Sequence, residues 1–187
     1  MTGHASRGAS RRPEISIIVE DPAWRRDDSL IRTIRRAAHV AASAPPAGKA
    51  PRIEIPAASL LLSSDEYVQQ LNAAFRKKKK PTNVLAFPAL PQAAPYLGDV
   101  ALAYAVVSRE ASEQGKSVAA HAAHLAIHGI LHLLGYDHHR QLDARLMENQ
   151  EIMLLARLGI GNPYAPVPVR KRNFRNKLSP CPTTPVR

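Results

Sequence analysis

The apolar and polar positions predict strands and helices that alternate unevenly along the chain. β-branched and aliphatic runs bounded by turn residues indicate strands, and apolar residues three or four positions apart indicate amphipathic helices. Ser and Asp residues precede several helical segments, where their side chains would cap the first turn. We therefore predict strands over residues 14–20, 52–62 and 98–107, an extended segment over 82–87, and helices over about 28–43, 65–75, 108–115, 117–135 and 142–158.

This order of elements is typical of an α+β fold, which we expect to contain a small mixed β-sheet packed by helices. The length of 187 residues suits one domain with tails. Segment 13–165 is the predicted domain. Segment 1–12 has the composition of a disordered basic arm, and segment 166–187 has that of a basic, proline-rich tail.

The charge of the chain predicts a polyanionic partner. Its formal net charge is +11 and its sequence pI is about 10.3. An excess of this size attracts nucleic acids, because each phosphate contact releases condensed counterions. The alternative is a solubility role, or tails that are basic for an unrelated reason, since part of the excess lies in the two terminal segments.

The composition also indicates a reducing, cytoplasmic environment. The chain has one cysteine, Cys181, which has no disulfide partner within the chain. No apolar region of a secretory signal follows the basic N-terminal residues. No stretch approaches the roughly 18 apolar residues that a membrane span requires, so we expect no membrane partner.

A cluster of histidines carries the strongest chemical signal. His128 and His132 are four positions apart, so a helix places them on one face, one turn from each other. Gly135 follows where a left-handed residue would end the helix, and the chain can then turn back to bring in His138. We therefore predict a metal site on this long helix in the C-terminal half of the chain and on the turn after it. The alternative is a chance cluster on an alanine- and leucine-rich helix.

Three neutral imidazoles are typical of a catalytic zinc site, because they leave one tetrahedral position free. We expect one Zn²⁺ ion, although imidazole also suits nickel, copper and iron. The same histidine spacing occurs in metzincin proteases, whose general base is a glutamate after the first histidine. Here that position is Gly129, which cannot accept a proton, so a zinc peptidase is a disfavoured alternative.

The sequence HGILHLLGYDH, residues 128–138, resembles the signature of the YbeY family of bacterial endoribonucleases that mature ribosomal RNA. Three further blocks resemble this family over residues 71–88, which include PTNVLAFP, over LGDV at 97–100, and over 158–164. The resemblance spans about residues 14–165 and leaves both tails outside.

The resemblance implies an α+β fold, a metal held by three histidines and a functional arginine at Arg76. It also implies a single-strand-specific, zinc-dependent endoribonuclease that acts in 16S rRNA 3′-end maturation and ribosome quality control. Its partners would be rRNA and the ribosomal small subunit, with ribosomal proteins or assembly GTPases as further candidates. Two features depart from the family pattern: Ala86 replaces a usual serine, and segment 77–80 is unusually basic.

The residue chemistry agrees with RNA cleavage. The Arg76 guanidinium would stabilise charge on phosphodiester oxygens, although an arginine at a helix end also satisfies helix carbonyls. Asp137 would accept a hydrogen bond from a ligand imidazole, or would cap the next helix. Four consecutive lysines would follow the RNA backbone as point charges, or would form a solvated loop: Lys77, Lys78, Lys79 and Lys80.

Two questions stay open at the level of the sequence. No general base is evident, so the attacking group is either a metal-activated water or the 2′-hydroxyl of the RNA. The activity itself also has an alternative: a ribosome-assembly factor that binds RNA and uses its metal only for structure.

Overall fold

The computed structural model describes residues 12–48 and 52–165. The predicted basic tail, and all of the predicted basic arm except Arg12, lie outside these residues. The described part contains four strands, five α-helices and two short 3-10 helices. Their bounds are β1 Glu14–Val19, η1 Pro22–Arg26, α1 Asp28–Ala42, β2 Ala57–Ser63, α2 Asp65–Arg76, β3 Val84–Pro88, η2 Pro91–Ala93, β4 Tyr96–Ala103, α3 Tyr104–Glu113, α4 Val118–Leu133 and α5 Gln141–Arg157.

The four strands form one mixed sheet in the order β1-β2-β4-β3. β1 pairs in parallel with β2, and β2 pairs in parallel with β4. β3 pairs only with β4, in the antiparallel direction, so it forms an edge of the sheet. The predicted α+β class with a small mixed sheet is confirmed.

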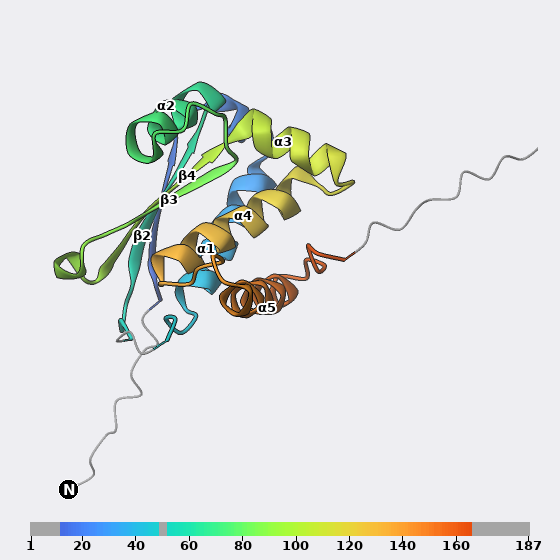
Figure 1. The fold of residues 1–187 in the computed structure, drawn as a ribbon. Coiled ribbons are helices and arrows are strands. Elements are labelled where there is room, and N and C mark those ends of the chain that lie inside the picture. Colours follow the sequence, from blue (N-terminus) through green and yellow to red (C-terminus); the bar gives the residue numbers. More distant parts are fainter. Residues whose placement is uncertain (1–11, 49–51, 166–187) are drawn as a thin grey trace, which may run out of the picture.

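Helix α4 lies at the centre of the molecule. It packs against α1, against β3 and β4 of the sheet, and against α5 (Figure 1). Its buried residues belong to the main core, in which Ile127, Ile130 and Leu131 are fully buried. Helix α2 covers part of the opposite face of the sheet, where a smaller cluster includes Val68 and Leu85. The central position of α4 fixes the histidines that it carries relative to the sheet.

The predicted boundary between the strand over 98–107 and the helix over 108–115 is wrong. β4 ends at Ala103, and α3 already begins at Tyr104. The Asp65 carboxylate at the start of α2 accepts hydrogen bonds from the backbone N–H groups of Ala105 and Val106, at 3.0 and 3.1 Å. This cap comes from a residue some 40 positions away, so the apolar pattern of residues 98–107 does not predict where α3 begins.

Within the described residues, none of the helices combines the length and the apolar character needed to cross a membrane.

Candidate metal centre

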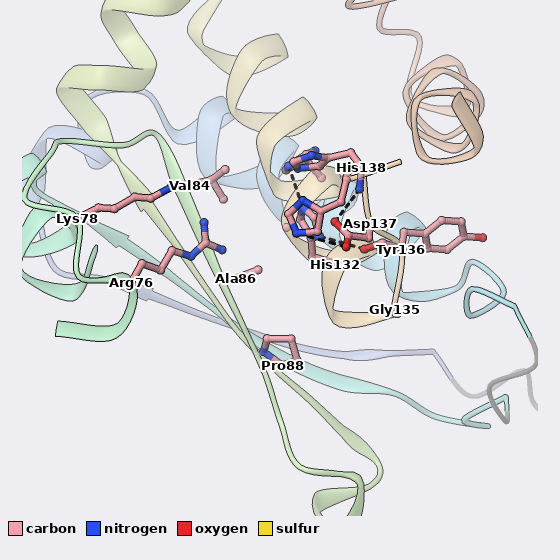
Figure 2. Close-up of a pocket in the computed structure, with 13 residues that line it drawn as sticks. Arg76, Lys78, Val84, Ala86, Pro88, His132, Gly135, Tyr136, Asp137 and His138 are labelled. Atoms are coloured by element: carbon pink, nitrogen blue, oxygen red, sulfur yellow. Dashed lines mark hydrogen bonds and ion pairs between the residues drawn. The ribbon is translucent and has the colours of Figure 1, made fainter. Parts of the chain in front are cut away.

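Two of the three predicted ligands lie on α4, and the turn after the helix carries the third. His128 and His132 are one helical turn apart. Gly135 ends the helix with a φ of +88°, a conformation that favours glycine. The N–H groups of Gly135 and Tyr136 donate to carbonyls of the last helical turn, each at 3.0 Å. This turn reverses the chain and brings the His138 ring beside those of His128 and His132, the second of which is labelled with it in Figure 2.

The three imidazoles converge on one point. One ring nitrogen each from His128, His132 and His138 lies within 4.8 Å of the other two, so the three residues could hold a metal ion. The Nε2 atoms of His128 and His132 are 3.1 Å apart. The His138 ring centroid lies 5.4 Å from that of His128 and 5.0 Å from that of His132.

Hydrogen bonds at the Nδ1 atoms of His128 and His132 favour a cation between their Nε2 atoms. The Nδ1–H of His132 donates to the Tyr136 carbonyl at 3.0 Å, and that of His128 donates to the Glu151 carboxylate at 2.8 Å. In a neutral ring, Nε2 then carries a lone pair. Two lone pairs that face each other at 3.1 Å repel unless a proton or a metal ion lies between them. Two nitrogens bound to one tetrahedral zinc lie roughly 3.3 Å apart, so this donor set fits such an ion.

The protonation state of His132 also suits a ligand. Burial and the neighbouring His128 and His138 rings lower its pKa to about 4. The ring is therefore neutral near pH 7, which is the form that binds a metal.

A buried glutamate from α5 completes the surroundings of His128. Glu151 is 1% exposed, and its Oε1 accepts the hydrogen bond from His128. Its Oε2 accepts hydrogen bonds from Nε2 of His124, at 2.6 Å, and from the Tyr164 hydroxyl. Burial by itself raises the pKa of the Glu151 carboxyl, but the hydrogen bonds from His124 and His128 outweigh it and lower the pKa to about 2. Glu151 is therefore an ionised carboxylate.

The histidines border a cavity of about 690 Å³ that also contains Arg76. Alternate residues of the edge strand β3 form an apolar part of its lining: Val84, Ala86 and Pro88. Arg76, the last residue of α2, extends over Ala86 toward the histidines from the opposite side (Figure 2). Its guanidinium makes no hydrogen bond or ion pair within residues 12–48 and 52–165, so it is available to a ligand in the cavity. The expected alternative, a side chain bonded to helix carbonyls, is not observed.

The lysine loop contributes one side chain to the cavity. Lys78 lines it beside Arg76, whereas Lys77, Lys79 and Lys80 lie outside the lining. The backbone of the loop is fixed by side chains of α2, because Gln69 and the buried Asn72 donate to the carbonyls of Lys79 and Lys80, at 3.2 and 2.8 Å. All four lysines are exposed to solvent.

Asp137 lies beside the candidate ligands, but its contacts are local. Its Oδ1 accepts the backbone N–H of His138 at 2.7 Å, and its Oδ2 lies 3.5 Å from Nε2 of His139. The N-cap of α5 is Arg140, so the helix-capping alternative for Asp137 is wrong. In the described part of the chain, Nδ1 of His128 contacts Glu151 and Nδ1 of His132 contacts the Tyr136 carbonyl instead.

Glu151 is the site residue that the sequence reasoning missed, although a signal was present. The buried residues of α5 are Met147, Glu151, Leu154 and Leu155, which have the spacing of one helical face. A glutamate within an apolar stripe must find partners, because an isolated buried carboxylate is costly. A glutamate at this position therefore requires an internal hydrogen-bonding partner.

Comparison with known proteins identifies the family. The family model described as Endoribonuclease YbeY matches residues 25–159. An Endoribonuclease YbeY from Rhodopseudomonas palustris is 45% identical over 167 residues, which cover 86% of each chain. One from Gluconobacter oxydans is 44% identical over 156 residues, which cover 83% of this chain and 90% of the relative. A solution structure from Thermotoga maritima is 20% identical, covers 84% of this chain and 99% of its own, and has a TM-score of 0.49. The chain thus belongs to the Endoribonuclease YbeY family.

Proposed function

We propose that this protein is a metal-dependent endoribonuclease that cleaves single-stranded RNA at the cavity between Arg76 and the three histidines. The observation that carries the proposal is the convergence of His128, His132 and His138 on one point at the wall of that cavity. The name of the relatives, Endoribonuclease YbeY, supports the same activity. The net charge of +11 supports an RNA substrate.

The three histidines would hold one Zn²⁺ ion, because imidazole nitrogens are common zinc ligands and their spacing fits one ion. When bound, the ion supplies a Lewis acid that polarises a phosphoryl oxygen. The Tyr136 carbonyl and the Glu151 carboxylate keep the Nδ1 protons on two of the rings, so that their Nε2 atoms would be free to hold the ion.

The other residues of the cavity bind and orient the RNA. The Arg76 guanidinium would hold two oxygens of the scissile phosphate and stabilise the charge that develops on them. Lys78 adds a second positive charge on the same side of the cavity. The apolar lining from β3 would pack against the sugar or base and exclude water.

The biological substrate that we propose is precursor ribosomal RNA, with a role in 16S rRNA 3′-end maturation and ribosome quality control in the cytoplasm. The proposed partners are the ribosomal small subunit and, in addition, ribosomal proteins or assembly GTPases. These assignments follow the family and the positive charge of the chain.

The test is a cleavage assay on the full chain loaded with Zn²⁺. Single-stranded RNA, the same RNA in a duplex, a precursor with the 16S rRNA 3′ end, and casein are offered separately. We expect cleavage of the single strand and the precursor, with duplex and casein intact, and no cleavage by a His132→Ala variant. RNA binding without cleavage would instead favour an assembly factor with a structural metal. A cyclic phosphate at the new ends would identify the 2′-hydroxyl as the attacking group, and a linear phosphate would identify water.

A further inference from the structure

Both carboxylate oxygens of Glu151 are occupied by side chains from other segments. Oε1 contacts the candidate ligand His128 on α4. Oε2 contacts His124, one turn earlier on the same helix, and Tyr164, which follows α5. Glu151 therefore joins three separate segments at a point that is 1% exposed.

The contacts around Glu151 hold the carboxylate in one orientation. The His124 and Tyr164 rings meet edge to face with their centroids 5.7 Å apart. The other nitrogen of His124, Nδ1, is buried with no hydrogen-bond partner among the described residues, so the polar contact of this ring is with Glu151. Lys116 donates to the Pro163 carbonyl at 2.7 Å and thereby fixes the chain next to Tyr164.

Burying a carboxylate at this position costs free energy, so packing alone does not explain why the residue is a glutamate. Its neighbours on the same face of α5 are Met147, Leu154 and Leu155, and an apolar side chain would pack among them. The carboxylate instead fixes the ring of His128, because the bond to Nδ1 leaves Nε2 pointing at Nε2 of His132, 3.1 Å away.

We propose that Glu151 is a positioning residue of the metal centre, and that His124 and Tyr164 hold it in place. This inference rests on the proposed metal site. The role of Tyr164 is inferred from its contacts in this structure. The carboxylate sets the direction of the His128 lone pair before the metal arrives, which raises the affinity for the ion.

The chain offers a matched control at another histidine of α4, His121, whose carboxylate partner is Glu110 of α3. Glu110 contacts Nε2 of His121 at 2.8 Å and also accepts a hydrogen bond from Asn83 at 2.9 Å. This carboxylate–histidine pair resembles that of Glu151 and His124, but His121 is not one of the three candidate ligands. Replacing Glu110 therefore perturbs a similar contact without removing a partner of the three candidate ligands.

The experiment compares the Zn²⁺ affinity of four full-length proteins: the unaltered chain, Glu151→Gln, Tyr164→Phe and Glu110→Gln. Affinity is measured by competition with a chromophoric chelator, and thermal unfolding without metal checks each fold. A glutamine keeps the shape of Glu151 but sets an N–H group against one of its hydrogen-bond donors. We expect Glu151→Gln to weaken Zn²⁺ binding by about 10- to 100-fold and to alter the visible spectrum of the Co²⁺-loaded protein. Glu110→Gln should bind within about twofold of the unaltered chain, since it lies outside the proposed partners of the ligands.

Tyr164→Phe keeps the test decisive if Glu151→Gln does not fold. It removes one hydroxyl and retains the ring, and we expect an affinity loss of up to about fivefold, equivalent to one hydrogen bond. Equal affinity of the unaltered chain and the folded Glu151 and Tyr164 variants would overturn the role of Glu151 and leave the proposed function intact. An unaltered chain that binds no metal would overturn both proposals.

Discussion

At the scale of single residues, the three candidate ligands differ in how firmly their rings are held. His128 is bonded to a buried carboxylate and His132 to a backbone carbonyl, both through Nδ1. His138 is exposed and lies on the turn after α4, where its backbone N–H contacts Asp137. Metal binding would therefore cost more side-chain freedom at the exposed His138 than at the first two rings, whose Nδ1 atoms are already hydrogen-bonded.

This difference predicts unequal effects of removing the ligands. We expect His132→Ala to weaken Zn²⁺ binding by more than roughly 100-fold, beyond the range seen for residues that only support a ligand. His138→Ala should weaken Zn²⁺ binding less, because the exposed His138 ring gives up more side-chain freedom when it binds the ion. Chelator competition measures both variants, with His139→Ala as the control, since that ring is 83% exposed. A loss of metal in His139→Ala would instead place the ion in the neighbouring group of Asp137, His138 and His139.

Arg76 should separate catalysis from metal binding. Because its guanidinium reaches the cavity and has no partner in the described residues, Arg76→Ala should keep its Zn²⁺ affinity and lower kcat/KM by about 100-fold or more. Arg76→Lys should recover only part of this loss, since an ammonium cannot bind two phosphate oxygens in the same plane. Arg145→Ala, which removes an exposed arginine of α5 outside the cavity lining, is the control. Unchanged turnover in Arg76→Ala would reduce Arg76 to a solvated surface residue.

At the scale of elements, the approach of α4 to the sheet depends on Gly129. A Cβ atom added at this position would lie 2.5 Å from Cγ1 of Val100 on β4. The glycine that occupies the place of a protease glutamate therefore has a packing role. It lets α4 lie close to β4, which holds His128 and His132 at the cavity next to β3.

The close contact predicts an unusual response to a small substitution. In an exposed helix, Gly→Ala stabilises by about 1 kcal/mol, but overpacking a core costs about 1–3 kcal/mol. We expect Gly129→Ala to lower the free energy of unfolding by roughly 1 kcal/mol. In a Val100→Ala background the added methyl group fills vacated space, so the same change should be neutral or stabilising. Denaturant unfolding is measured for the unaltered chain, for Gly129→Ala, for Val100→Ala and for the double variant. An equal effect of Gly129→Ala on the free energy of unfolding in both backgrounds would contradict the packing role of Gly129.

Elements and site residues were predictable where their signals are local. The helix with His128 and His132 and the turn at Gly135 follow from spacing within a dozen positions, and the structure has both. The start of α3 was missed, because its cap is Asp65, a residue of another helix. The spacing on α5 places Glu151 among buried residues, but its partners come from α4 and from beyond α5, so periodicity does not identify them. Contacts between distant segments carry information that periodicity does not contain.

At the scale of the whole molecule, the candidate site is assembled from segments that are far apart in the chain. Arg76 ends α2, the lining residues belong to β3, and the histidines come from α4 and the following turn. Glu151 ties α4 to α5 beneath them. A metal bound by the three histidines would therefore fasten the turn after α4 to the centre of the fold, so the whole domain should respond to the ion.

Metal binding should therefore raise the stability of the whole domain. An ion that binds the folded form alone stabilises it by about 2.7 kcal/mol at a free concentration 100 times its Kd. For a domain of this size that corresponds to an increase in Tm of roughly 5–10 °C. Thermal unfolding with Zn²⁺ and with excess EDTA measures the shift. His132→Ala is the control that separates this site from adsorption of zinc to surface histidines, because the variant retains the other seven histidines. A variant that shifts as much as the unaltered chain would show that the stabilising ion binds elsewhere, whereas a shift confined to the unaltered chain would tie domain stability to this histidine cluster.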